Sequence, residues 1–481
     1  MARLDKRRPA GHSRAVRTGG TGGTGTSLWR HRNFLLLWSG QSVSEIGSSV
    51  TQLALPLTAV VVLRASTFQV GLLTAASTAA FALIALPAGA LVDRWAKRRL
   101  MIWCDVARMV IIGSVPLAAA LGVLTLGQLY AVAITAGVGT VFFDVAYQSY
   151  LPEVVDRAHL VEGNGKLGAT QAFAQVTGPG LGGALTGLVG AARALAADSI
   201  SYAVSVASLL AMNVREEARP AEGARPGLRR EIAEGLSFVL RHPVLRKIVA
   251  CTGTANLFGS MALALEIVFL VRVLRVRPAD TGLLIAVASL GGVAGGLLAG
   301  RLGRRIGSAR IIWYSLLVFG FPQLIIPLAA PGWRLAAFPV GLACFSFSAV
   351  VYNVAQVSYR QAICPPRLLG RMNAAVRWVV FGTLPLGAVI GGALGSLVGV
   401  RPTLWIAFAG SWAAGWWVYF SPLRRQRDFE DQPDPGDPAD PGDPSGPEAV
   451  GDLEDQRAPG SGLPGHSGGK LPDGAGPQLG D

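Results

Sequence analysis

Residues 89–99 read Gly-Ala-Leu-Val-Asp-Arg-Trp-Ala-Lys-Arg-Arg, a short charged segment in an otherwise apolar part of the chain. The apolar runs 69–92 and 100–124 lie on either side of it. A helix needs about 20 apolar residues to cross the hydrocarbon core of a bilayer. Each run is long enough, so residues 89–99 are predicted to contain a loop at the membrane surface between two spanning helices.

The composition of the whole chain is typical of a membrane protein. Of its 481 residues, 51% are hydrophobic and 15% are charged, whereas a soluble domain has about 25% charged residues. The mean hydropathy is +0.44. The net charge of +14 does not indicate a nucleic-acid-binding protein, because the basic residues are few and lie between long apolar runs.

Apolar runs of spanning length occur twelve times and predict an all-α integral membrane protein with twelve transmembrane helices. The predicted spans are 34–63, 69–92, 100–124, 127–150, 166–190, 193–214, 246–271, 279–300, 309–330, 333–359, 372–400 and 402–422.

The spans fall into two six-helix halves, 33–214 and 246–422, joined by a cytoplasmic linker, 215–245. The basic N-terminal segment 1–32 and the acidic, Pro/Gly-rich segment 423–481 are predicted to be disordered, because they have too little apolar surface to bury.

Short motifs repeat between the halves. Gly71-Leu72-Leu73 returns 211 residues later as Gly282-Leu283-Leu284. Gly182-Gly183-Ala184-Leu185 returns 209 residues later as Gly391-Gly392-Ala393-Leu394. Such internal symmetry is typical of transporters that bind their substrate between two structural repeats. It predicts two six-helix pseudo-repeats around a central cavity.

The basic residues predict the orientation. With both termini in the cytoplasm, 34 of the 43 lysines and arginines lie in cytoplasmic segments and 7 lie outside. Short cytoplasmic loops are enriched in Lys and Arg. We therefore expect a multi-pass protein of the cytoplasmic membrane with both termini inside.

The loop after the second span resembles the loop motif of the major facilitator superfamily, G-x-L-x-D-R-x-G-R-K/R. The matching residues are Gly89, Leu91, Asp93, Arg94, Lys97 and Arg98, and Ala96 replaces the second glycine. The resemblance implies that this loop is a cytoplasmic latch that helps to hold the outward-facing state. We expect Asp144 of the fourth span to contact Arg94 or Arg98 in this latch.

The fifth span resembles the antiporter motif of the same superfamily, G-x8-G-x3-G-P-x2-G-G. Its matching residues are Gly165, Gly178, Pro179, Gly182 and Gly183, and Ala174 stands at the remaining glycine position. The resemblance implies an exporter. The alternative is ordinary packing of small residues between helices.

Further residues, from Phe142 to Glu153 and from Asp198 to Tyr202, resemble the branch that contains macrolide-efflux proteins, enterobactin-type exporters and transmembrane secretion effectors. Many drug antiporters of the superfamily have an arginine in the fourth span, and the span 127–150 has none. The proton mechanism of those antiporters therefore does not transfer directly.

Carboxylates within the spans are the main candidates for function, because charge inside a bilayer is costly. Gln41, Glu45, Ser48 and Gln52 lie on one face of the first helix, and a polar stripe should face a wet cavity. Candidates for the substrate cavity or for proton coupling are Glu45, Gln41, Gln52, Asn256, Glu266 and Asp198. Each carboxylate could instead be structural. Asp198 lies close to the outer end of its span, so a gate or a solvated role is as open for it as binding. We expect Asp105 and Arg108 to form a structural pair with each other or with the latch loop.

The sequence therefore predicts a transporter that exports a small amphipathic molecule, such as a drug, siderophore or secondary metabolite, by proton antiport with alternating access. An uncoupled facilitator or importer, or a non-transporting membrane sensor, remains an alternative. We expect a monomer in the lipid bilayer that binds a small molecule and protons, with no nucleic acid, cofactor or metal. An enzyme is not expected, because all five histidines lie outside the spans.

Overall fold

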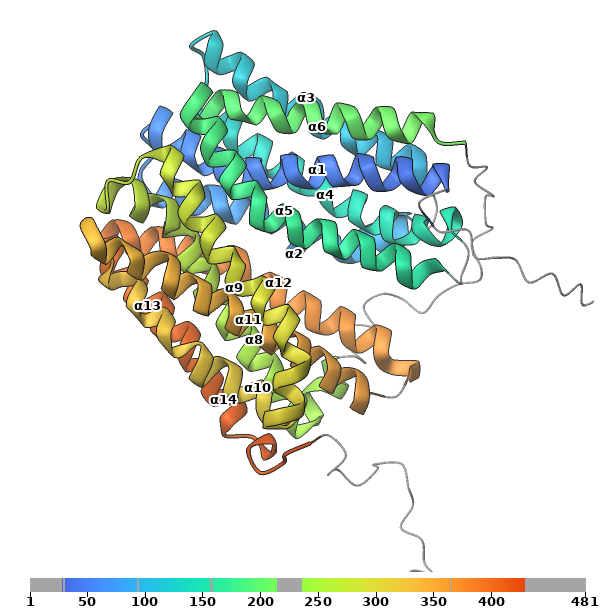
Figure 1. Ribbon diagram of the computed structural model, residues 1–481, viewed down its shortest axis with the longest axis vertical. Helices are drawn as coiled ribbons and strands as arrows, with labels where there is room; N and C mark the ends of the chain where they lie inside the picture. The colour runs from blue at the N-terminus through green and yellow to red at the C-terminus, as the bar shows by residue number, and fades with distance from the viewer. Residues whose placement is uncertain are drawn as a thin grey trace, which may run out of the picture. The chain divides into compact units, whose positions relative to one another are not determined.

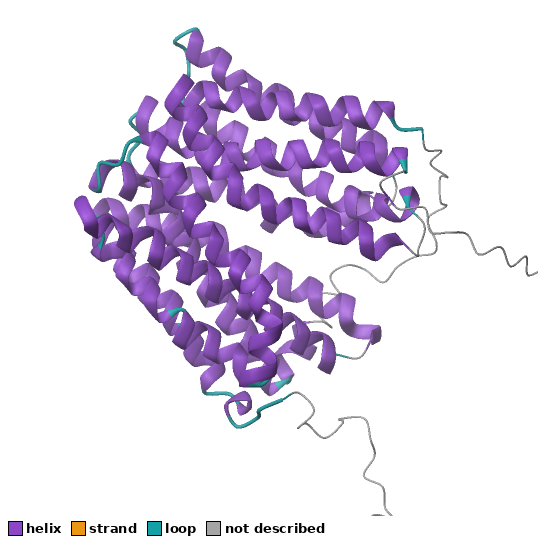
Figure 2. Cartoon of the chain, viewed as in Figure 1, coloured by secondary structure: helices purple, strands orange, loops and turns teal. Residues whose placement is uncertain are grey.

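The structure is a computed structural model, and it describes residues 28, 31–92, 95–155, 159–213, 236–364 and 366–428. Within these ranges the secondary structure is helical and no strand occurs (Figure 2). A chain in the bilayer core has no water to hydrogen-bond its backbone, and a helix satisfies these groups within itself. The all-α prediction is confirmed.

The N-terminal half, labelled α1 to α6 in Figure 1, is a bundle of long helices. These are α1 (Arg32–Leu57), continued by the π-helical turn η2 (Thr58–Val62), α2 (Thr67–Val92), α3 (Lys97–Ala120), α4 (Leu126–Val154), α5 (Leu160–Val189) and α6 (Ala191–Ala211). Helix α1 packs against α5 and α6, and α3 packs against α4 and α6.

The C-terminal half is a second bundle in which several rods consist of more than one element (Figure 1). Its elements are α8 (Pro243–Val268) with η4 (Phe269–Val273), α9 (Pro278–Ile306), α10 (Arg310–Tyr314) with η5 (Ser315–Phe319) and η6 (Phe321–Leu328), η7 (Gly332–Ala336) with α11 (Ala337–Ile363), α12 (Pro366–Leu397), α13 (Val400–Ala413) with α14 (Gly415–Tyr419), and η8 (Pro422–Arg424).

Ten of the described helical rods are long and apolar enough to span a membrane. The other two predicted spans correspond to α5 and to α13 with α14. Helix α5 has 30 residues but is rich in Gly, Gln and Thr, and the last rod is interrupted at Ala414. The outward faces of the rods bear large apolar side chains such as Leu188, which is 81% exposed. Such a surface suits lipid.

The predicted span 309–330 is not a continuous α-helix. It changes to a π-helical turn at Ser315 and to a 3-10 helix after Gly320. Pro322 and Pro327 lack the N–H that an α-helix needs at these positions. The predicted segments 1–32, 215–245 and 423–481 fall mostly outside the described residues, so their boundaries and disorder stay predictions.

The two halves share local features that the sequence motifs did not include. Helices α1 and α8 are both capped by a histidine, His31 and His242, whose Nδ1 accepts backbone N–H groups of the first turn. Both rods end in a π-helical turn that is followed by an arginine with positive φ, 53° at Arg64 and 55° at Arg275. These features lie 211 residues apart, which is the spacing of the repeated Gly-Leu-Leu motif.

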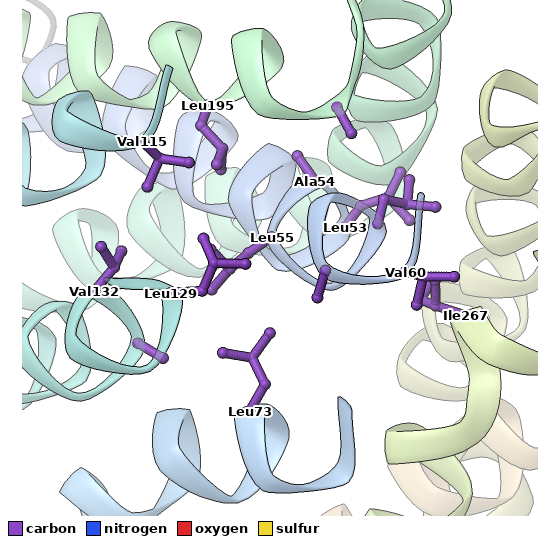
Figure 3. Close-up of a cluster of buried hydrophobic side chains, with 14 of the residues drawn as sticks. Leu53, Ala54, Leu55, Val60, Leu73, Val115, Leu129, Val132, Leu195 and Ile267 are labelled. Carbon is purple, nitrogen blue, oxygen red and sulfur yellow. The ribbon is translucent and has the colours of Figure 1, made fainter. Parts of the chain in front are cut away.

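The halves meet through two equivalent helix pairs, α2 with α12 and α5 with α9. A cluster of buried apolar residues also joins them, in which Val60 of η2 lies beside Ile267 of α8 (Figure 3). Arg272 of η4 adds a polar link, because it donates a hydrogen bond of 2.5 Å to the carbonyl oxygen of Ala65. The apolar cluster and the Arg272 contact lie toward the helix ends that are predicted to face outward.

Glycines occur where the paired helices cross. A Cβ placed on Gly71 of α2 would lie 2.6 Å from the Cα of Gly392 on α12, and one placed on Gly183 of α5 would lie 2.9 Å from the Cα of Gly282 on α9. These distances leave no room for a side chain. We refer to these two contacts as the glycine crossings.

Candidate transport site

A central cavity of about 840 Å³ lies between the two halves. The N-terminal half contributes most of its polar wall, from α1 to α6. The C-terminal half contributes mainly apolar residues of α8 and α9, together with Glu266, Ser289 and Ser346. The cavity is therefore polar and charged on one side and largely apolar on the other.

The polar stripe on α1 faces this cavity, since Gln41, Glu45, Ser48 and Gln52 all line it. The Nε2 of Gln41 donates a hydrogen bond of 2.9 Å to Oε1 of Glu45, and Ser48 bonds to the hydroxyl of Tyr202 at 2.8 Å. Gln52 is exposed to the open space. The spacing of 4, 3 and 4 residues had placed these side chains on one helix face, and that face lines the cavity.

Asp198 of α6 also lines the cavity, but its carboxylate is held by other side chains. Thr51 donates a hydrogen bond of 2.5 Å to one carboxylate oxygen, and Ser201 donates one of 3.1 Å to the other. The residue is fully buried. Gly47 permits this contact, because any side chain there would collide with Ser201. The solvated role left open for Asp198 is therefore wrong.

The expected pair of Asp105 and Arg108 is formed, and both side chains are buried. Ser205 donates a further hydrogen bond of 2.6 Å to Asp105. The guanidinium carbon of Arg108 lies 4.6 Å from the ring centre of Phe143 and 4.4 Å from that of Tyr202. Such cation–π contacts stabilise a desolvated cation.

Arg108 reaches the wall of the cavity, which the sequence analysis did not anticipate. Its NH1 donates a hydrogen bond of 3.3 Å to Thr140 on α4. Helix α4 has no arginine of its own, and α3 supplies the positive charge beside it. The signal in the sequence was a lone arginine inside an apolar span, three residues after an aspartate.

Asp144 lines the cavity instead of approaching the latch. Helix α4 continues to Val154, so Asp144 lies ten residues, or roughly 15 Å, before the end of the helix. Among the described residues Asp144 accepts no hydrogen bond, and the expected contact with Arg98 is not formed. A contact with Arg94 lies outside the described residues.

The candidates of the C-terminal half separate from each other. Glu266 lines the central cavity, whereas Asn256 does not. The two residues are ten positions apart on α8 and therefore point about 80° away from each other around the helix axis. Ser260, which shares the face of Asn256, donates a hydrogen bond of 2.6 Å to the carbonyl oxygen of Leu384 and links α8 to α12.

The transmembrane secretion effector family, a branch of the major facilitator superfamily, matches residues 24–439. The chain belongs to this family. The resemblance seen in the loop and helix motifs is thereby confirmed, and the protein is a multi-pass membrane transporter by its fold and family.

Several curated proteins with similar sequences are named as efflux proteins. The chain is 26% identical over 419 residues to the multidrug efflux pump Tap of Mycobacterium tuberculosis. This alignment covers 83% of the present chain and 96% of Tap. The chain is 23% identical over 391 residues to macrolide efflux protein A of Streptococcus pyogenes. This alignment covers 79% of the present chain and 92% of the efflux protein.

A solved structure shares the fold. A variant of the nucleoside transporter NupG aligns with a TM-score of 0.67 and 11% identity, over 80% of this chain and 98% of that one. At this identity the likeness concerns the fold alone.

The latch segment of the family motif is tied to two neighbouring helices. Lys97 forms an ion pair of 2.6 Å with Glu153 and a hydrogen bond of 3.2 Å with the carbonyl oxygen of Ser149, both on α4. Arg98 donates hydrogen bonds of 2.7 and 3.0 Å to the carbonyl oxygens of Leu209 and Leu210 at the end of α6. Asp93 and Arg94 lie outside the described residues, and Gly89 lies within α2.

The residues of the antiporter motif on α5 lie in four different surroundings. Gly178 and Gly182 pack against α1, where an added Cβ would collide with Ser49 or come within 3.3 Å of Val50. Gly183 forms a glycine crossing, and Pro179 lines the cavity. A Cβ on Gly165 would meet nothing within 4 Å.

Within the part of the chain that the structure describes, no group of acidic, His and Cys side chains could hold a metal ion.

Proposed function

We propose that this protein exports small amphipathic molecules across the cytoplasmic membrane in exchange for protons. The observation that carries this proposal is the central cavity, because both halves enclose it and two carboxylates, Glu45 and Asp144, face its open space. Its volume of about 840 Å³ lies in the range of sites that bind drug-sized ligands, roughly 300–1,000 Å³. The efflux proteins Tap and macrolide efflux protein A support the direction of transport.

Charge balance supports coupling to protons. Arg108 is the one cation among the described residues that line the cavity, and Asp105 already neutralises it. An ionised carboxylate at the centre of a spanning helix costs about 2.5–3.5 kcal/mol on an insertion scale. Glu45 and Asp144 therefore require protons or a cationic substrate to balance their charge. Exchange of a proton for a cationic substrate at these carboxylates would couple export to proton entry.

The glycine crossings support alternating access. They close the helix ends that are predicted to face outward, while the cavity lies deeper between the halves. Parting of α2 from α12 and of α5 from α9 would open the cavity to the outside. Flat contacts between glycines can separate and form again without rearrangement of side chains.

Transport by the purified full chain in proteoliposomes tests this function. An imposed pH gradient is expected to drive accumulation of radiolabelled erythromycin, a macrolide, by the wild type. Glu45→Gln and Asp144→Asn are each expected to lower this accumulation at least tenfold, while the downhill exchange of erythromycin persists. Glu162→Gln is the control, because this exposed glutamate pairs with Lys166 at the start of α5, far along the helix from Pro179.

The alternatives give different results. If the pH gradient does not change transport by the wild type, the protein is a facilitator. If Glu45→Gln and Asp144→Asn both retain full gradient-driven transport, these carboxylates do not couple protons. If no flux of any probe occurs and deletion of residues 424–481 abolishes a cellular response, the protein is a sensor.

A further inference from the structure

A second cavity of about 60 Å³ lies inside the C-terminal half. Leu263 and Glu266 of α8 line both this side pocket and the central cavity, so the two spaces meet at these residues. Four of the nine other residues that line the side pocket are phenylalanines, and the remaining five are glycine or aliphatic. The phenylalanines are Phe269 of η4, Phe338 and Phe345 of α11, and Phe408 of α13.

The carboxyl group of Glu266 has no partner among the residues that the structure describes. Its Oε1 is enclosed and accepts no hydrogen bond, and neither of its oxygens is bonded or ion-paired to any described residue. A buried charge without a partner is strongly unfavourable. Asp105 and Asp198 of the N-terminal half are both satisfied by neighbouring side chains. Glu266 therefore differs from them, because no described residue offsets its charge, and a proton or a cation from outside the chain has to do so.

The aromatic rings favour an organic cation as this counter-ion. The faces of phenylalanine rings attract ammonium groups, and several rings together form cages for quaternary ammonium ligands. Phe345 and Phe408 form a T-shaped pair with ring centres 6.2 Å apart, and Phe269 and Phe338 lie 6.4 Å apart. A metal or a hydrated inorganic cation would prefer oxygen ligands, and the wall supplies only one carboxyl group.

Among the described residues, one cation contacts a ring of this pocket. The guanidinium carbon of Arg401 is 5.7 Å from the ring centre of Phe269, and its NH2 donates a hydrogen bond of 2.9 Å to the carbonyl oxygen of Ala329. Arg401 therefore engages Phe269 and a backbone group, and it forms no ion pair with Glu266. Phe338, Phe345 and Phe408 remain as rings for a ligand.

We propose that the side pocket binds the ammonium group of cationic substrates, with Glu266 as counter-charge and the phenylalanines as an aromatic cage. The apolar body of the substrate lies in the central cavity. The pocket volume of 60 Å³ is about that of two water molecules in the liquid, which suits a small alkylammonium group and excludes a whole drug molecule. The proposal deepens the proposed export function, on which it rests, and assigns substrate charge selection to the C-terminal half and proton coupling to Glu45 and Asp144.

Equilibrium binding in detergent at pH 7 tests the pocket without a gradient or transport. The probes are two dansyl amides of nearly equal shape, one with a 2-(trimethylammonio)ethyl group and one with a neutral 3,3-dimethylbutyl group. We expect the wild type to bind the cationic probe at least tenfold more tightly than the neutral one. Glu266→Gln should reduce this ratio to about two or less and leave the affinity for the neutral probe within twofold.

Further variants separate the contribution of the phenylalanine rings from that of the Glu266 carboxylate. Phe345→Leu keeps an apolar wall but removes a ring face, so it should weaken binding of the cationic probe about threefold or more and change the neutral probe little. Glu162→Gln is the control for loss of a carboxylate, because this exposed residue lines neither cavity, and it should keep the tenfold ratio. If Glu266→Gln fails to yield folded protein, Phe345→Leu and Phe408→Leu decide the question.

The proposal is overturned if the wild type does not distinguish the two probes, or if Glu266→Gln keeps the tenfold ratio. It is also overturned if Glu266→Gln abolishes gradient-driven transport of erythromycin and yet retains the preference for the cationic probe, since Glu266 would then be a proton site. Intact proton-driven transport without charge selection would reject the side pocket and leave the export function standing.

Discussion

Gly71 of α2 and Gly392 of α12 lie so close that a Cβ on Gly71 would come within 2.6 Å of the Cα of Gly392. Their repeat equivalents, Gly282 and Gly183, form the second glycine crossing. Each crossing therefore combines the first repeated motif of one half with the second repeated motif of the other. The repeats seen in the sequence are the contact surfaces of the two halves.

Gly71→Ala is expected to open the predicted outer end of the protein. A methyl group at this position must displace the backbone of α12, and overpacking of a tight contact costs about 1–3 kcal/mol. The cost falls on the closed arrangement, so the population of molecules with an accessible cavity rises about fivefold or more. The rate at which an impermeant thiol reagent modifies a Gln52→Cys reporter from outside measures this change.

Gly165→Ala is the matched control for the crossings. It belongs to the same helix motif as Gly183, but an added Cβ meets no atom within 4 Å. We expect thiol modification at the unchanged rate. If Gly71→Ala behaves like Gly165→Ala, the glycine crossings do not hold the outer end closed.

Removal of one partner from the pair of Asp105 and Arg108 should strongly destabilise the protein. Arg108→Gln leaves the buried carboxylate of Asp105 without its counter-charge, which typically costs about 3–5 kcal/mol. The double variant with Asp105→Asn removes both charges and should recover most of this loss. Unfolding of the detergent-purified wild type, of Arg108→Gln, of Asp105→Asn and of the double variant gives the four free energies of a double-mutant cycle.

Arg108→Lys provides a second check on this pair. Lysine keeps the charge but loses the planar guanidinium that contacts Phe143 and Tyr202 and bonds to Thr140. We expect stability between that of the wild type and that of Arg108→Gln. A lysine variant as stable as the wild type would show that charge alone explains the pair.

The sequence could predict what depends on one helix at a time. Apolar run length predicted the rods, and the spacing of Gln41, Glu45 and Ser48 predicted a common face, because the helix period fixes which residues point together. The internal repeats predicted two related halves. These features need no knowledge of how the helices pack.

Features that depend on packing between helices were missed. Arg108 reaches the cavity wall because Thr140 and Phe143 of α4 and Tyr202 of α6 surround it, and no spacing within α3 encodes those neighbours. Asp144 was placed near a helix end because the predicted span stopped four residues too early. Glu266 was a candidate from its position in a span, but its missing partner became visible only with the side pocket.

The cap of α8 predicts a contribution to stability that depends on pH. The Nδ1 of His242 accepts hydrogen bonds of 3.3 Å from the backbone N–H groups of Val244 and Leu245. Only the neutral imidazole has this acceptor. Partial burial lowers the pKa of His242 from its ordinary value of 6.5. The unfolded chain therefore binds a proton more readily than the folded one, and the contribution of the cap is complete above pH 6.5 and is lost as the pH falls below that value.

His242→Asn separates this effect from the titration of other groups. Asparagine also caps helices but does not titrate, so the difference in melting temperature between the wild type and the variant should grow in favour of the variant from pH 7.5 to pH 5. His242→Ala should lower stability by about 1 kcal/mol at pH 7.5, where the cap is complete, and by less at pH 5. A pH-independent difference between the wild type and His242→Asn would show that protonation of His242 does not weaken the folded state.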